Sequence, residues 1–298
     1  MFQFFKNPNF DIVGKRRFAL ILSLTIIVAG IIALFLMGLN YGVDFAGGAK
    51  MQIDFKENIS AEELRSLFTE KGLGNPEIKS SGENEYMITI PANETDNSDE
   101  LLETALKGID YEILQIDKVG PKMGAEMRNN SYSAVAIALL LILIYITVRF
   151  EFKFAIGAVV ALVHDVLITL AFFSVFQWEF SLPVLAAFLT IVGYSLNDTI
   201  VVYDRIRENI KIHKGKPLKD VINLSVNQSL GRTIITSLTT FLVVLILAIF
   251  GGQVLFGFSI AMVVGVIVGT YSSMFVAAPI LIAWEHRFKE DDEKKKKK

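Results

Sequence analysis

Two aspartates lie inside long apolar segments, where an ionisable side chain is costly. Asp198 lies in the run Gly193-Tyr-Ser-Leu-Asn-Asp-Thr, and Asp165 follows His164 near the middle of another apolar segment. A charged side chain at the centre of a membrane costs about 2.5–3.5 kcal/mol or more, so such residues normally face a protein interior or a water path. The chemistry open to a buried carboxylate of this kind is the uptake and release of a proton.

The residues around Asp198 indicate a polar path along one helix. Tyr194, Asn197 and Asp198 recur at helical spacing and form one stripe, and we include the adjacent Thr199 in the same path. The stripe belongs to the inner half of its segment, because the charged Asp204 marks the inner boundary. We therefore expect Asp198 to lie in the inner half of the membrane, within a bundle of helices.

Arg232 is a third candidate, at the inner start of a later apolar segment. Thr236 and Thr239 or Thr240 follow on its face, which predicts that the arginine points towards other helices. A guanidinium close to Asp198 would favour the ionised carboxylate, whereas burial favours the protonated one. A site balanced between these two effects can exchange a proton at accessible pH.

Both aspartates also have a purely structural interpretation. Asp198 and Arg232 could form a static ion pair that holds two helices together. His164 and Asp165 could bond neighbouring helices, or they could belong to the supporting polar path. The sequence leaves these alternatives open.

The segments that carry these residues are long enough to cross a membrane. The 298-residue chain is 52% hydrophobic and has a mean hydropathy of +0.48, which is high for a soluble domain. A membrane-spanning helix needs about 20 predominantly apolar residues. The segments that meet or nearly meet this requirement are 18–38, 131–148, 154–176, 180–203, 233–250 and 254–284.

The distribution of lysine and arginine predicts the orientation of these spans. With the N-terminus inside, the inner segments are 1–17, 149–153, a basic loop at 204–232 and a tail at 285–298. Together they hold 20 of the 29 Lys and Arg residues, and the other nine lie in the outer segment 39–130. We therefore expect a multi-pass membrane protein with both termini on the inner side of the membrane.

The outer segment has the pattern of one small domain. Strand and helix signals alternate in the order β-α-β-β-α-β, which is typical of a ferredoxin-like fold. Ser60 and Glu63 fit a capping box at the start of the first helix, and 96–106 is predicted to be the second helix. With no cysteine in the chain and no catalytic or metal-binding pattern here, we interpret this domain as a binding or mechanical element. The predicted fold is thus a mostly α, six-helix transmembrane bundle with a small α+β ferredoxin-like outer domain between its first two spans.

Small residues recur every four positions along the last span. This pattern lets another helix approach closely, either within the bundle or from a second membrane subunit. The residues are Gly257, Ala261, Gly265, Gly269, Ser273 and Ala277.

Several of these motifs resemble the SecD/SecF family of protein-export membrane proteins. The run with Gly42, Asp44, Gly47 and Gly48 resembles the signature that opens the outer domain in this family. The run Val163-His-Asp-Val, the long motif around Asp198, and the segment that starts at Arg232 are similar to SecF in particular. The resemblance extends from about residue 10 to residue 284.

The resemblance implies a subunit of the accessory protein-export complex. It implies a proton-linked Asp198 and a partner arginine at Arg232, with the proton motive force pulling preproteins outwards in a late stage of translocation. The partners implied are a separate SecD-like membrane subunit, the SecYEG channel and an unfolded preprotein on the outer face, besides the lipid bilayer; nucleic acid is not among them. Protons are the coupling ion, and no other cofactor or metal is expected.

Other functions remain possible at this point. A proton-driven exporter of small molecules or lipids, of the resistance-nodulation-division type, would also use membrane carboxylates, although one small outer domain offers little room for a substrate pocket. A structural subunit that stabilises a channel would need no proton chemistry. An enzyme is disfavoured, because neither a Ser-His pattern nor a zinc-binding H-E-x-x-H pattern occurs.

Overall fold

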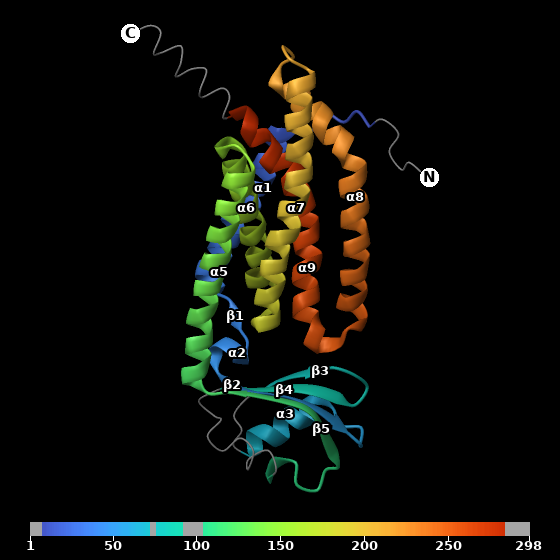
Figure 1. Ribbon diagram of the computed structural model, residues 1–298. Coiled ribbons are helices and arrows are strands. Elements are labelled where there is room, and N and C mark those ends of the chain that lie inside the picture. Colours follow the sequence, from blue (N-terminus) through green and yellow to red (C-terminus); the bar gives the residue numbers. More distant parts are fainter. Residues whose placement is uncertain (1–7, 72–75, 92–103, 284–298) are drawn as a thin grey trace.

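The computed structural model describes residues 8–71, 76–91 and 104–283, in which six long helices form a bundle with a small sheet at one end (Figure 1). The start of α1 and the end of α9 lie at the end of the bundle away from the sheet (Figure 1). The helices are α1 (Arg16–Met37), α5 (Pro121–Arg149), α6 (Phe152–Phe176), α7 (Leu182–Ile212), α8 (Leu218–Phe250) and α9 (Gly252–Ser272), and the π-helix η2 (Ser273–Ala277) continues α9.

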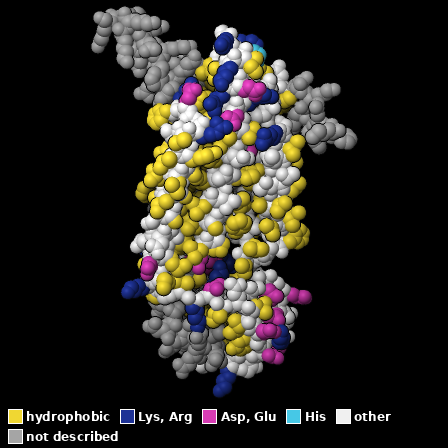
Figure 2. All heavy atoms as spheres, in the orientation of Figure 1, with side chains coloured by type: hydrophobic (Ala, Val, Ile, Leu, Met, Phe, Trp, Pro, Cys, Tyr) yellow, Lys and Arg dark blue, Asp and Glu magenta, His cyan; other side chains and the backbone are white. Residues whose placement is uncertain are grey.

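All six helices are long and apolar enough to cross a membrane. Their most apolar 18-residue windows have mean hydropathies between 1.6 and 2.9. Figure 2 shows hydrophobic side chains over the middle of the bundle, with charged side chains gathered towards its two ends. The predicted six-helix bundle is confirmed.

Three of the helices form the interior of the bundle. Half of the apolar window is buried in α6 and in α7 and 39% in α9, compared with 11% in α1 and α5 and 17% in α8. A polar site shielded from lipid therefore has to be built mainly on α6, α7 and α9.

The helices extend further than the apolar segments predicted. The segment 204–232, predicted as a loop, is helical except for 213–217, because α7 continues to Ile212 and α8 begins at Leu218. With 33 residues, α8 is about 50 Å long, which exceeds the roughly 30 Å of hydrocarbon, so part of it lies outside the membrane. Hydropathy marks where lipid contact ends, whereas the backbone hydrogen bonds of the helix continue into water.

The same difference occurs at the outer end of α5. This helix begins at Pro121, a residue favoured in the first turn, so the last ten residues of the predicted outer segment 39–130 are already helical. The outer domain is therefore joined to the second span without a flexible connection.

The outer domain is a four-stranded antiparallel sheet in the order β3-β4-β2-β5. This is the strand order of the predicted ferredoxin-like fold, with the first and third strands at the centre. Ser60 and Glu63 form the predicted capping box, in which the Glu63 amide donates to Ser60 Oγ at 3.2 Å and the Ser60 amide donates to Glu63 Oε2 at 2.9 Å. The elements are β2 (Gly48–Phe55), α3 (Ala61–Glu70), β3 (Glu77–Ser80), β4 (Glu85–Pro91) and β5 (Tyr111–Val119).

The predicted second helix, 96–106, lies mostly outside the described residues. At its end, Ala105 and Leu106 are buried in the same apolar cluster as Phe68 and Ile88. The sheet therefore has a core of its own, separate from the cores of the membrane bundle.

The small residues of the last span pack within the chain. A Cβ on Gly265 would lie 2.3 Å from Ile191 Cγ1 of α7, and one on Gly269 would lie 3.0 Å from Ser195 Cβ. Real Cβ atoms essentially never approach another atom as closely as the one at Gly265 would, so α9 requires glycine there, whereas at Gly269 the contact with Ser195 would be tight and the neighbour would have to move by a few tenths of an ångström. Of the two interpretations of this pattern, packing within one bundle is the one that applies to Gly265 and Gly269.

Candidate functional site

Asp198 is buried between three helices. It lies on α7 with 2% of its surface exposed, and Ser237 Oγ of α8 donates a hydrogen bond to its Oδ2 at 3.2 Å. Thr270 Oγ1 of α9 in turn donates to Ser237 Oγ at 2.7 Å. The carboxylate is therefore buried with hydroxyl groups, rather than a cation, as its immediate partners.

Arg232 is not brought into an ion pair with Asp198. Its side chain is exposed on α8, and no ion pair of the described residues includes it. The three threonines predicted to lie on its face, Thr236, Thr239 and Thr240, donate their hydroxyl protons to carbonyl groups of their own helix. The predicted role of Arg232 stays a prediction. The hydroxyl groups of Thr236, Thr239 and Thr240 already have hydrogen-bond acceptors within α8.

The remaining residues of the predicted path have different environments. Asn197 is exposed on the outside of the bundle. Tyr194 Oη and Thr199 Oγ1 are buried on α7 without a hydrogen-bond partner, and Thr233 Oγ1 of α8 shares this condition. Buried hydroxyl groups normally have a hydrogen-bond partner, so these three groups on α7 and α8 could each still form a hydrogen bond.

Asp165 is the centre of a second, more complete network. Its Oδ1 lies 2.8 Å from His164 Nδ1, while Ser195 of α7 and Ser272 of α9 both donate to its Oδ2. With 1% of its surface exposed, Asp165 thereby joins α6, α7 and α9 at their shared contact. These contacts agree with the interpretation that His164 and Asp165 bond neighbouring helices.

The network extends from His164 to the first helix. His164 Nε2 lies 2.9 Å from Ser23 Oγ of α1, which lies 3.0 Å from Tyr271 Oη of α9. Tyr271 Oη donates to the carbonyl of Ala19 at 2.7 Å. The polar groups therefore fix α1, otherwise largely exposed, against the interior helices.

The two networks occupy neighbouring positions on the same helices. Ser195 and Asp198 are one turn apart on α7, and Thr270 and Ser272 lie two residues apart on α9. Sequence analysis missed the hydroxyl partners Ser23, Ser195, Ser237, Thr270, Tyr271 and Ser272. Isolated serines in apolar helices carry no periodic signal of their own, although Ser195 and Ser237 lie inside the two motifs discussed above.

The glycine motif connects the outer domain to the start of α7. Strand β1 (Asn40–Tyr41) pairs in parallel with β6 (Glu179–Phe180), and the short helix α2 (Val43–Ala46) follows. Asp44 Oδ2 accepts a hydrogen bond from the amide of Leu182 at 2.8 Å, in the first turn of α7. A carboxylate at a helix N-terminus satisfies a free amide and complements the helix dipole.

The glycines of this motif lie in close contacts or have backbone angles that favour glycine. A Cβ on Gly42 would lie 2.6 Å from Glu179 Oε1. Gly47 and Gly48 have φ angles of 80° and 138°, which side chains rarely allow. The amide of Gly47 also leaves no space for a Cβ on Gly124 of α5, at 2.9 Å. The motif thus packs tightly against the starts of both α5 and α7.

An ion pair adds a second connection between the sheet and the bundle. Lys50 Nζ of β2 lies 2.6 Å from Glu179 Oε2 of β6, and both side chains are about one fifth exposed. The outer domain is therefore fixed to the turn between α6 and α7, near the start of the helix that carries Asp198.

Known proteins are similar to this chain in sequence and in fold. Residues 99–287 match the family described as protein export membrane protein SecD/SecF, C-terminal, and residues 32–59 match the SecD/SecF GG motif. A protein translocase subunit SecF from Desulfurispirillum indicum is 44% identical over 292 residues, with 94% of this chain and 93% of the relative covered. The chain belongs to the SecD/SecF family of protein-export membrane proteins. The resemblance inferred from the motifs is thus confirmed, and the glycine motif is the GG motif of the family.

Solved structures of this SecD/SecF family show the same fold. SecDF from Thermus thermophilus, described as a translocon-associated membrane protein, matches with a TM-score of 0.85 and 38% identity, over 94% of this chain and 39% of SecDF. SecDF in a super-membrane-facing form matches with a TM-score of 0.75 and 37% identity, over 98% of this chain and 41% of SecDF. The chain therefore spans about two fifths of SecDF, whereas it spans most of the SecF relative from Rhodothermus marinus, at 94%.

Proposed function

We propose that the chain is a SecF-like subunit that uses the proton motive force to assist late-stage translocation of preproteins through the SecYEG channel. Membership of the protein-export family supports a role in preprotein translocation. A SecD-like subunit is the expected partner, because in SecDF a region like this one is part of a chain more than twice as long. The subunit would then act as a translocase component and not as an enzyme.

One observation supports the proton as the coupling ion. Asp198 is buried at membrane depth, and a hydroxyl group donates its only hydrogen bond from the described residues. An ionised carboxylate in such surroundings is costly unless it is paired, so loss of the proton would favour an arrangement of the helices that pairs the charge. A proton that binds and leaves Asp198 would therefore alter the packing of α7 against α8 and α9.

Arg232 fits this proposal as the partner in a second arrangement of the bundle. The guanidinium is exposed here and forms no ion pair with Asp198, so pairing would require its side chain, or α7 and α8 themselves, to move. Proton coupling needs two such states that differ in their affinity for the proton. The membrane potential supplies about 2.3 kcal/mol per charge for each 100 mV, which is enough to bias two states of similar energy.

The shift would reach the outer domain through the start of α7. Asp44 accepts a hydrogen bond from the amide of Leu182 there, and Lys50 forms an ion pair with Glu179 of β6, three residues earlier in the chain. Movement of α7 along its axis would thus pull on the GG motif and on the central strand β2. The outer domain would transmit this movement to the preprotein.

The proposed orientation places the outer domain outside and both termini inside the cell. It is supported by the excess of lysine and arginine in the inner segments, 20 of 29. The start of α1 and the end of α9 also lie at the same end of the bundle, opposite the sheet (Figure 1). Protons would then enter from the side of the outer domain and leave towards the cytoplasm.

The test replaces Asp198 with asparagine, which keeps the size of the side chain and removes its exchangeable charge. Export of a secreted reporter is measured in cells that depend on the variant, with and without a protonophore. We expect Asp198→Asn cells to export as slowly as wild-type cells treated with the protonophore, and to gain nothing from the proton gradient.

The matched control is Asp204→Asn, which removes an exposed carboxylate less than two turns further along α7. It should export at the wild-type rate, and both variants should co-purify with the SecD-like subunit. Proton-dependent export that is undiminished in Asp198→Asn would refute the proposal. Loss of export on deletion of the chain alone, with both variants fully active, would instead favour a structural subunit.

A further inference from the structure

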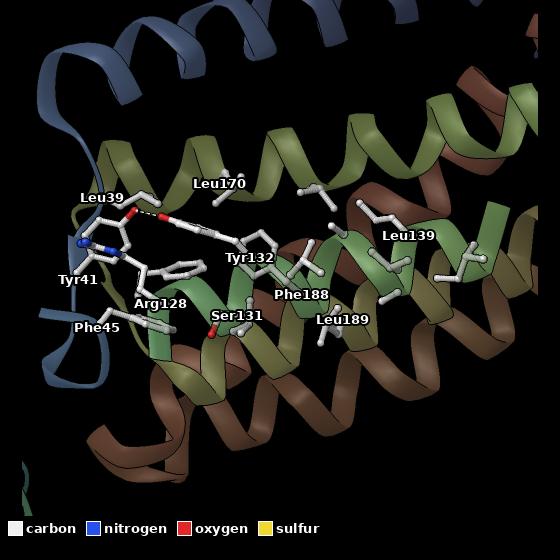
Figure 3. Close-up of a pocket in the computed structure, with 18 residues that line it drawn as sticks. Leu39, Tyr41, Phe45, Arg128, Ser131, Tyr132, Leu139, Leu170, Phe188 and Leu189 are labelled. Carbon is white, nitrogen blue, oxygen red and sulfur yellow. Dashed lines mark hydrogen bonds between the residues drawn. The ribbon is translucent and has the colours of Figure 1, made fainter. Parts of the chain in front are cut away.

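A long apolar cavity lies between α5 and the interior helices in the outer half of the bundle. Its volume is about 470 Å³, and α5, α6, α7 and the residues around β1 line it. Figure 3 shows that its labelled polar side chains gather at one end, whereas the rest of the lining is apolar. The polar residues are Tyr41, Arg128, Ser131 and Tyr132.

The polar end offers hydrogen-bond donors and a positive charge. Tyr41 Oη and Tyr132 Oη lie 3.2 Å apart, and the guanidinium carbon of Arg128 lies 5.9 Å from the centre of the Tyr41 ring. Burial and the hydrogen bond to Tyr132 raise the pKa of Tyr41 to about 12, so its hydroxyl stays protonated. Within the described residues Arg128 has no carboxylate within ion-pairing distance. An arginine placed in this way is available for an external anion.

The cavity has the depth of one leaflet of a bilayer. Its apolar lining on α5 runs from Ser131 to Ile142, a rise of about 16 Å over eleven helical steps, which is about half of the roughly 30 Å of hydrocarbon. Arg128 lies one turn further out, at the level of the headgroups. A methylene group is similar in size to a water molecule, whose share of liquid volume is about 30 Å³, so the cavity has room for about fifteen of them. The dimensions are those of a single acyl chain.

We propose that this cavity binds one acyl chain of an outer-leaflet phospholipid, whose anionic headgroup is held by Arg128 and by the hydroxyl groups of Tyr41 and Tyr132. The binding site is separate from Asp198 and does not depend on the proton proposal. Because the lipid would fill the space between α5 and α7, next to the GG motif, its binding would stabilise the outer half of the bundle.

The lining favours a lipid over a polypeptide segment. Any inserted peptide would bring backbone N–H and C=O groups to a wall that offers hydrogen-bond partners only at its mouth, and each unsatisfied group is costly at membrane depth. An acyl chain has no such groups. Its phosphate is the one polar part, and the arginine stands where that part would lie.

The first experiment tests the headgroup. The purified full-length chain in mild detergent is titrated with phosphatidylglycerol or with zwitterionic phosphatidylcholine, and bound lipid is counted by native mass spectrometry. We expect phosphatidylglycerol to bind more tightly, and Arg128→Gln to weaken it at least about tenfold. Lys122→Gln, which removes a cation of the same helix outside the cavity, is expected to leave binding unchanged.

The second experiment tests the cavity itself. Ala138 lines it, so Ala138→Phe should fill the space and abolish tight binding of either lipid, whereas Ala134→Phe on the outside of α5 should not. As a control, thermal unfolding of both variants is compared with that of the wild-type chain to check that α5 still packs against the bundle. Binding that is indifferent to headgroup charge and to both Arg128→Gln and Ala138→Phe would overturn the proposal, and so would the absence of any tightly bound lipid in the wild-type chain.

Discussion

The contact between α7 and α9 makes a quantitative prediction about a single glycine. Gly265 faces Ile191, and a Cβ built on this glycine would lie 2.3, 2.4 and 2.8 Å from three side-chain carbons of the isoleucine. Ile191 is 1% exposed and cannot turn away into solvent. Gly265→Ala should therefore force the two helices apart by several tenths of an ångström.

The expected free-energy change combines two opposite contributions. Alanine favours a helix over glycine by about 0.8–1.0 kcal/mol. Inserting a methyl group into a packed core costs about 1–3 kcal/mol, and the three short contacts place this site at the upper end of that range. We expect Gly265→Ala to destabilise the protein by about 2 kcal/mol, whereas Gly193→Ala, where a Cβ meets nothing within 4 Å, should be neutral or stabilising.

The assay is thermal unfolding of the purified protein in mild detergent, followed by tryptophan fluorescence. Ile191→Ala alone should cost about 2–5 kcal/mol through the cavity it leaves. In the double variant the new methyl group occupies that cavity, so the combined loss should be smaller than the sum by about 1–3 kcal/mol. Equal melting temperatures for Gly265→Ala and Gly193→Ala would refute the packing described for this contact.

Three further predictions concern polar contacts. Asp165→Ala removes the acceptor of three buried hydrogen bonds and should lower the stability by about 3–5 kcal/mol, measured by the same unfolding assay. Lys50→Gln breaks a partly exposed ion pair with Glu179, so global stability should change by less than about 1 kcal/mol. Amide exchange in the β1–β6 pair should nevertheless become several times faster, and unchanged exchange would argue against this connection. Hydrogen bonds from Ser60 lower the pKa of Glu63, so their stabilising effect is present at neutral pH and is lost as the pH falls through that lowered pKa. Ser60→Ala should raise the pKa of Glu63 towards its ordinary value, which carboxyl NMR titration would detect.

Much of the fold could be predicted because its determinants are local. Hydropathy is a property of one segment at a time, and the six spans could be located without knowing their neighbours. The capping box of Ser60 and Glu63 is equally local. The boundary near residue 204 could not be located in this way, because the polar residues that follow continue the helix in water. Arg205 and Glu208, one turn apart on α7, form an ion pair on this extension.

The site was harder to predict because its contacts cross between helices. Asp198 and Asp165 could be recognised from their depth alone. Their partners depend on how the helices are rotated and crossed, and for Asp198 the residue that meets it is Ser237, five positions after Arg232. A hydroxyl group in a membrane helix can also bond its own backbone, as Thr236 does, so a threonine stripe does not show which way a path runs.

The hydrogen bonds of the two aspartates suggest that they have different tasks. Asp165 Oδ2 accepts hydrogen bonds from Ser195 and Ser272, so a proton on this oxygen would require one of the two serines to give up its bond and accept one instead. Protonation there disturbs the shared contact of α6, α7 and α9, which suits a fixed point of the bundle. Asp198 Oδ1 accepts no hydrogen bond from the described residues, so a proton can bind it without displacing one. If one carboxylate changes its charge during translocation while the other holds the helices around it, these contacts favour Asp198 for the change, in line with the proposal above.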